Sequence, residues 1–206
     1  MSSPPRTRTV SRWDAVGMAF YALLGIALVV ATTVTAVIRI VEVVANDGVR
    51  VFAQFAGTPA DAPIGPDGTP VEIELDTAWL VAPELPVASV GALVIEQVVI
   101  VAAVAVVVFC LLMLMWNTLR GQVFSRGNTT LVATAGIAGF VGVAAAPFFG
   151  NMGANGAFAW ISDRTFDNVI LSASPVQLLG LGFIISLAIT VFTVGDRLQR
   201  DTKGLV

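Results

Sequence analysis

Four long apolar runs without a charged residue dominate this chain of 206 residues. Each run has 21 to 27 residues, and at ~1.5 Å of rise per residue a helix of that length spans roughly 31–40 Å. The hydrocarbon core of a bilayer is about 30 Å thick, so each run predicts one transmembrane helix. We therefore expect an all-α membrane protein with four transmembrane helices. The runs are 15–38, 97–119, 129–149 and 168–194.

The composition narrows the classes of function. Hydrophobic residues make up 56% of the chain and charged residues 12%, which is typical of a membrane protein rather than of a soluble domain. No histidine is present, which excludes His-ligated haem, most catalytic zinc sites and a histidine general base. Cys110 is the single cysteine, so no disulfide can form within the chain. The net charge of −3 is small, and we expect no cofactor, no metal and no direct nucleic-acid contact.

The distribution of lysine and arginine predicts the orientation in the membrane. Eight of these residues lie before the first run, between the second and third runs, and after the fourth, whereas the other two connections carry three. Basic loops stay in the cytoplasm, so we expect a multi-pass membrane protein with both termini there. The first run is too long for the apolar part of a cleaved signal peptide, so we expect a retained helix.

The expected segment boundaries follow from the apolar runs and the charges between them. Transmembrane helices are expected at 14–40, 89–119, 129–149 and 168–195. Cytoplasmic segments are expected at 1–13, 120–128 and 196–206, and extracytoplasmic segments at 41–88 and 150–167.

The segment between the first two helices is acidic and has strand-like patterns. Residues 39–90 hold eight carboxylates against two arginines. Alternating apolar residues at 49–55 and 71–75 predict strands, and the Pro- and Gly-rich stretch 57–70 predicts turns. We expect a small extracytoplasmic β-rich cap of two or three strands. Because two strands alone are marginal in water, this cap should lean on the helix ends or on a partner chain.

The carboxylates of the second expected strand have two interpretations. Glu72, Glu74 and Asp76 alternate with apolar residues and would project from one face. No loop in the segment has the D-x-[DN]-x-[DN]-G pattern of a calcium site. We expect a solvated acidic face, with a weak cation site or a docking surface for a basic partner as the alternatives.

Glu96 is the acidic residue that intrudes on an apolar stretch. It is expected one to two turns inside the outer end of the second helix, where a charge costs less than at the bilayer centre. As a functional group it would gate a pathway or coordinate an ion, with Gln97 beside it. The favoured interpretation is that Glu96 reaches the outer surface or pairs with Arg39 at the end of the first helix.

The third helix carries a stripe of small residues that predicts close helix packing. Small residues four apart let helix backbones approach each other. The neighbour could be a helix of the same chain, which we favour, or a second subunit. Pro147 should kink or end this helix, leaving a polar turn at 150–155. The candidate packing residues are Ala135, Ala138, Gly139, Gly142 and Ala146.

Two segments on the expected cytoplasmic side carry candidate contacts for a protein partner. Gly121 is placed to end the second helix, and Ser125 or Asn128 can cap the third. The tail after the fourth helix is charged and amphipathic, and its basic residues can anchor it to the membrane surface. The candidate contacts are Gly121, Phe124, Ser125, Asn128, Arg197 and Leu198.

The same two segments carry a family resemblance. The patterns G-x-V-F-S-x-x-N at 121–128 and G-x-x-L-x-x-D-x-x-G-L-V at 195–206 resemble the YoaS-like family of bacterial four-span membrane proteins, a domain-of-unknown-function family. The resemblance implies four helices, an extracytoplasmic loop after the first and a place in the bacterial inner (plasma) membrane. It also implies a gene neighbour that encodes a small Cro/CI-type helix-turn-helix regulator. It implies no established catalytic or binding residue.

These observations favour a non-enzymatic sensor or interaction protein that couples the extracytoplasmic cap to a cytoplasmic partner, such as a small helix-turn-helix regulator. The alternatives are a structural accessory subunit of a larger membrane complex and a small channel or transporter that uses Glu96. The expected partners are the lipid bilayer and a protein partner or a second copy of the chain. An enzyme is not expected, because the sole lysine, Lys203, lies in the tail and no Ser–Lys pair can form within the membrane.

Overall fold

The computed structural model describes residues 12–162, 172 and 174–203. Its four long helices are long and apolar enough to cross a membrane, as the apolar runs predicted. Each has 29 to 36 residues, or roughly 44–54 Å, so its ends extend beyond a ~30 Å hydrocarbon core. In chain order the elements are α1 (Arg12–Ala45), β1 (Val49–Ala62), the short 3₁₀ helix η1 (Pro66–Gly68), β2 (Val71–Ala82), α2 (Val87–Leu119), α3 (Arg126–Ile161) and α4 (Pro175–Lys203).

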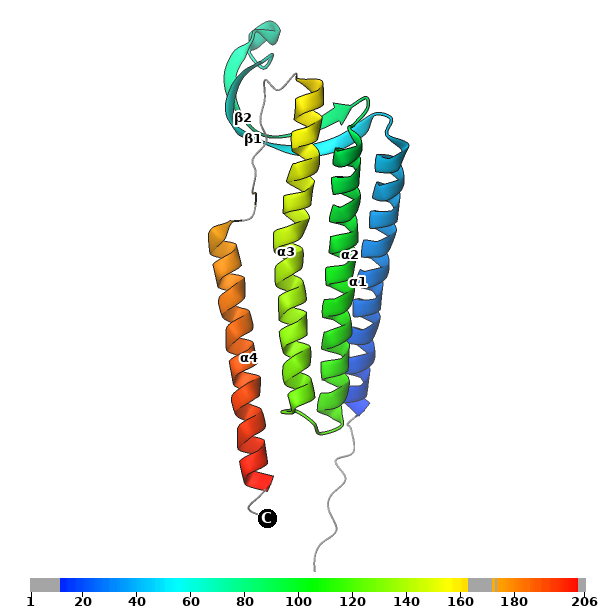
Figure 1. Ribbon diagram of the computed structural model, residues 1–206, viewed down its shortest axis with the longest axis vertical. Helices are drawn as coiled ribbons and strands as arrows, with labels where there is room; N and C mark the ends of the chain where they lie inside the picture. The colour runs from blue at the N-terminus through cyan, green and yellow to red at the C-terminus, as the bar shows by residue number, and fades with distance from the viewer. Residues whose placement is uncertain (1–11, 163–171, 173, 204–206) are drawn as a thin grey trace, which may run out of the picture.

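The helices lie side by side in a row in the order α1, α2, α3, α4 (Figure 1). α2 packs between α1 and α3, whereas α4 packs mainly against α3. The sheet covers one end of the row, here called the sheet end. The α2–α3 loop and the last turns of α4 lie at the opposite end, here called the loop end (Figure 1). The row exposes many apolar side chains, such as Leu23, Leu179 and Phe183, as expected for helices surrounded by lipid.

β1 and β2 form a two-stranded antiparallel sheet between α1 and α2, where the β-rich cap was predicted. The pairing runs from Val49 opposite Ala82 to Ala62 opposite Val71. Alternate side chains in the first half of β1 are buried, as the period of a half-buried strand requires. These buried residues are Val49, Val51, Ala53 and Phe55.

The prediction that 57–70 forms turns is wrong for the first part of this stretch. β1 continues to Ala62, because a register shift absorbs Gly57, whose φ is +72°. Pro59 is tolerated in this strand because a two-stranded sheet leaves one edge of each strand unpaired. The turn itself is η1, in which Asp67 also has a positive φ of 60°.

The buried face of the sheet packs on the ends of α2 and α3. Phe55 of β1 meets Phe158 of α3 edge to face, with the ring centroids 4.9 Å apart. This burial stabilises a sheet that two strands alone would leave marginal, and it confirms that the cap leans on the helix ends. The cluster consists of Val43, Val49, Val51, Ala53, Phe55, Ala82, Leu85, Leu93, Ala154, Ala157 and Phe158.

Asn46 ties the end of α1 to the start of α2 beneath the sheet. Its side-chain amide donates to the Leu85 carbonyl oxygen at 3.1 Å, and its Oδ1 accepts from the Leu85 N–H at 2.8 Å. Its φ of 52° is one that asparagine adopts more readily than most residues. α1 continues beyond the expected end at residue 40, since Val43 is fully buried under the sheet.

α3 does not end at Pro147, and the expected turn at 150–155 is helical instead. Proline removes one backbone hydrogen bond from a helix, yet α3 continues to Ile161 because its last turns are held by packing. Ala154 and Ala157 have no exposed surface. The expected extracytoplasmic loop at 150–167 is therefore helical in its first part, and 163–167 lie outside the described residues.

Candidate functional site

The sheet roofs a cavity of about 480 Å³ between α1, α2 and α3. Its walls combine apolar side chains with one cation, one carboxylate and several amide or hydroxyl groups. It lies where the chain brings together its sheet and its three closely packed helices. The charged and polar side chains that line it are Arg39, Gln54, Glu96, Gln97, Asn151 and Ser172.

Glu96 faces this cavity from the third turn of α2, and its side chain points toward α3. A Cβ added at Gly150 would lie 2.9 Å from Oε1 of Glu96, so the carboxylate rests against the backbone of α3. Glu96 is thus half-buried between two helices, and its expected reach to the outer surface stays a prediction. Gln97, its predicted companion, lines the same cavity.

Arg39 lies across the cavity but does not pair with Glu96. Its guanidinium instead pairs with Glu42 at 3.4 Å and donates to the Arg50 carbonyl oxygen, which ties α1 to β1. The predicted contact pair is thus replaced by two opposite charges on different walls of one cavity.

Aromatic side chains form the roof above these charges. Phe52 of β1 and Trp79 of β2 meet edge to face with centroids 5.3 Å apart, and both line the cavity. The Arg50 guanidinium covers the Trp79 ring at 5.4 Å. Because both strands supply roof residues, any movement of the sheet changes the shape of the cavity.

Asn151 connects the cavity to the segment that leads into α4. Its side chain is buried and donates to the Ser172 hydroxyl oxygen at 3.0 Å. A cavity with a cation, a carboxylate and amides can bind a small polar or charged ligand. Among the described residues, no group of three or more His, Cys, Asp or Glu side chains could hold a metal ion.

The expected acidic face of the sheet is present and lies apart from this cavity. Glu72, Glu74 and Asp76 are exposed on β2. Glu72 and Glu74 line a shallow open groove with Gly57 and Pro59 rather than converging on one point.

The predicted stripe of small residues lies between α3 and α2. A Cβ added at Gly142 would lie 2.6 Å from the Cβ of Ala103, and one at Gly139 would lie 3.7 Å from Val107. Ala146 is buried near the same α2–α3 interface, here called the seam, and borders the cavity. Ala135 and Ala138 are half-buried one to two turns toward the loop end.

The seam extends further toward the sheet end than the predicted stripe. Gly150, Gly153 and Gly156 also face α2, and a Cβ at Gly153 would lie 2.6 Å from Leu93. These glycines recur every three residues and so stay on one side of the helix, but the expected helix end at residue 149 excluded them. Gly136 was also missed, and it faces Ile185 of α4 instead.

At the loop end, Asn128 organises the α2–α3 loop from inside. It donates to the Val123 carbonyl oxygen at 2.9 Å and to that of Gln122, and it accepts from Asn117 at 2.8 Å. It has no exposed surface, so the expected contact between Asn128 and a partner is wrong. Its side chain therefore satisfies two backbone carbonyl oxygens of the loop and the Asn117 amide.

Ser125 and Gly121 complete the same loop. The Ser125 hydroxyl oxygen accepts from the Asn128 N–H at 3.2 Å and caps α3, as predicted. Gly121 follows α2 with a φ of +80°, a conformation that favours glycine. Both residues therefore have a structural role in the loop.

The remaining predicted contacts meet α4 or solvent. The Phe124 ring packs edge to face on Phe192 at 5.6 Å and lies against Gly195, where an added Cβ would come within 2.4 Å of it. Arg197 and Leu198 are exposed on α4, Leu198 to 61%. These two side chains are therefore accessible at the surface of α4.

Comparisons of the chain with protein-family models, with curated proteins and with solved structures found no match. The resemblance to the YoaS-like family stays a prediction.

Proposed function

We propose that this protein is a non-enzymatic sensor of the bacterial cell membrane. In this proposal a small polar or charged ligand binds the cavity under the extracytoplasmic sheet, between Arg39 and Glu96. The bound state is transmitted along α3 to a cytoplasmic protein partner at the loop end. The observation that supports this most is that one unbroken helix, α3, borders the cavity at Gly150 and carries the Asn128 loop at its other end.

The helix packing supports transmission over this distance. α2 and α3 contact each other closely from Gly139 to Gly156, so a shift at the cavity moves both helices together. α4 packs mainly against α3 and meets the α2–α3 loop through Phe124. A movement of α3 therefore changes how α4 and the loop are presented to a partner.

The output surface is the exposed end of α4 around Arg197 and Leu198. An exposed leucine flanked by charged side chains suits a weak, reversible contact with a small protein. The predicted partner of this surface is a small helix-turn-helix regulator.

Purification from mild detergent tests this function, with one variant in the cavity and one at the exposed end of α4. We expect the wild type to retain a cytoplasmic partner, Leu198→Glu to lose it, and Glu96→Gln to change the retained amount at least threefold. The matched controls are Ile64→Glu, on the exposed turn of the sheet, and Glu84→Gln, an exposed carboxylate outside the cavity. Both controls should behave as the wild type.

The outcomes separate the candidate functions. Retention that is insensitive to Leu198→Glu, or that changes equally with Glu84→Gln and Glu96→Gln, contradicts the coupling proposal. Stoichiometric recovery of a large membrane complex, unaffected by Glu96→Gln, would favour the accessory-subunit alternative.

A further inference from the structure

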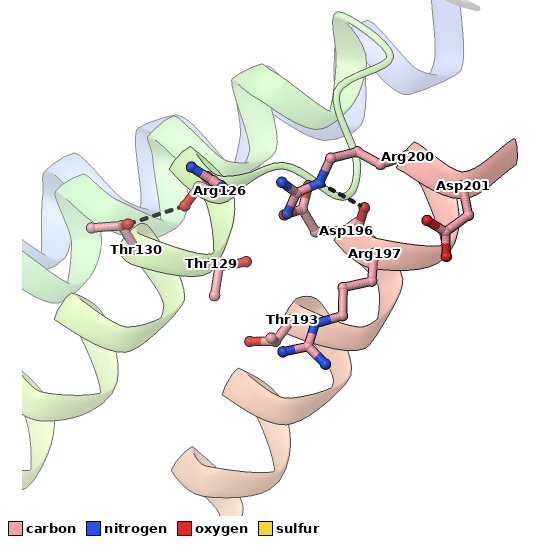
Figure 2. A pocket seen from close by; sticks show the side chains of 8 residues that line it. All are labelled: Arg126, Thr129, Thr130, Thr193, Asp196, Arg197, Arg200 and Asp201. Carbon is pink, nitrogen blue, oxygen red and sulfur yellow. Dashed lines mark hydrogen bonds and ion pairs between the residues drawn. The ribbon is translucent and has the colours of Figure 1, made fainter. Parts of the chain in front are cut away.

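The loop end holds a second polar pocket, formed where α3 begins and α4 ends (Figure 2). It has a volume of about 680 Å³ and is built from two helices that are distant in the sequence. Figure 2 shows the three arginines and the hydroxyl groups arranged around one open space. The lining residues are Arg126, Thr129, Thr130, Thr193, Asp196, Arg197, Arg200 and Asp201.

Three arginines and two aspartates, Asp196 and Asp201, line this pocket, so the arginines are in excess by one charge. Asp196 is buried and pairs with Arg200, so these two charges largely neutralise each other. Arg126 and Arg197 form no ion pair with any residue that the structure describes. They come from different helices and are both exposed, so they are free to bind an anion from two sides.

The position of α3 adds to this preference. Arg126 is the first residue of α3, and the N-terminus of a helix carries a partial positive charge that favours anions. Guanidinium groups bind phosphate oxygens through paired, charge-assisted hydrogen bonds. The Thr129 and Thr130 hydroxyls donate to the backbone oxygens of Ser125 and Arg126, so the arginines are the side-chain donors that remain for the anion.

The depth of the pocket identifies a source for the anion. Its residues lie at the ends of two membrane-compatible spans, Arg126–Ile161 and Pro175–Asp201, which is the level of lipid headgroups. Basic pockets between transmembrane helices are suited to anionic headgroups. We propose that this pocket binds an anionic phosphate group, supplied by the headgroup of a membrane phospholipid that sits between α3 and α4.

Native mass spectrometry of the full chain in non-ionic detergent tests this site. The protein is titrated with phosphatidylglycerol, with phosphatidylcholine, and separately with soluble glycerol phosphate. We expect phosphatidylglycerol to bind about tenfold more tightly than phosphatidylcholine. Arg126→Gln and Arg197→Gln should each weaken that binding about tenfold, because each removes a charge-assisted hydrogen bond.

The matched control is Arg120→Gln. Arg120 is an exposed arginine of the same end that stacks on Trp116 at 4.7 Å and does not line the pocket. Its loss should change lipid binding less than about twofold. The double variant Arg126→Lys/Arg197→Lys keeps both charges and should retain most of the preference, and the thermal unfolding midpoint of each variant verifies folding.

Each outcome decides the proposal. Competition by glycerol phosphate that depends on Arg126 and Arg197, without any preference for phosphatidylglycerol, supports the phosphate pocket with a soluble ligand as its source. Equal binding of both lipids without such competition would overturn the site. So would an Arg120→Gln loss as large as that of Arg197→Gln.

Discussion

The two sides of α3 differ in how a neighbouring helix meets them. On the α2 side, small residues from Gly139 to Gly156 let the backbones approach along half of the helix. On the α4 side, close approach is concentrated at Gly136 against Ile185, with Phe124 of the adjoining loop against Gly195. In lipid, an apolar side chain gains no hydrophobic free energy by moving from lipid tails to a protein neighbour. Close packing therefore determines which helices stay together. The difference indicates a firm α2–α3 pair with an adjustable α4.

This contrast also separates the two candidate sites. The cavity beneath the sheet is framed by the firmly packed helices and by the sheet core, which holds its charges in place. The loop-end pocket lies across the adjustable α3–α4 contact. A ligand in the first site can be recognised by fixed geometry, whereas a lipid in the second can set the position of α4.

The largest expected effect comes from filling the α2–α3 seam. Gly142→Leu places a side chain where even a Cβ would lie 2.6 Å from the Cβ of Ala103, so the backbones must separate. We expect a loss of about 3 kcal/mol in the free energy of unfolding, measured by denaturant titration in detergent. Gly180→Leu on α4 is the control, since nothing lies within 4 Å of its Cβ position. Equal losses in the two variants would contradict the proposed difference between the α2 and α4 sides of α3.

A smaller effect is expected from the buried amide at the loop end. Asn128→Ala leaves the Val123 carbonyl oxygen and the Asn117 amide without this partner, at an expected cost of about 2 kcal/mol. The thermal unfolding midpoint should fall, whereas Gln122→Ala, which truncates an exposed side chain of the same loop, should leave it unchanged. A stable Asn128→Ala protein would show that the loop does not depend on this residue.

The smallest effect is expected at the α4 contact itself. Phe124→Ala removes the edge-to-face pair with Phe192, which contributes about 1 kcal/mol. Hydrogen exchange over 190–200 should become faster while exchange across the α2–α3 seam stays constant. Phe183→Ala, an exposed ring on α4, serves as the control. Faster exchange in the seam would mean that the two interfaces are not independent.

The sequence predicted the spans well, because the length of an apolar run can be read from neighbouring residues and compared directly with the thickness of a bilayer. The sheet also followed from alternation at 49–55. The extension of α3 past Pro147 did not, because Asn151 and Asn155 look like turn residues. In the fold their side chains bond to Ser172 and to the helix backbone. Polar residues therefore mark a helix end only when no internal partner is present.

The site was predictable in part. Glu96 was singled out because a charge in an apolar run is costly, but its direction depended on Gly150, far along the chain. The sequence could not predict whether Asn128 is an exposed partner contact or a buried structural residue, since an asparagine amide suits both. The limited close packing between α3 and α4 could not be inferred either, because lipid-facing and helix-facing positions are equally apolar.

Paired spin labels on the two sides of α3 test whether α2 and α3 form a firm pair while α4 changes position, with Cys110→Ser as the background. One pair joins Thr118→Cys of α2 to Thr134→Cys of α3, and the other joins Thr134→Cys to Val194→Cys of α4; all three positions are exposed. We expect a narrow first distance distribution that Glu96→Gln leaves unchanged, and a second that is broader and shifts with Glu96→Gln. A second distribution as narrow as the first, and unmoved by Glu96→Gln, would contradict it.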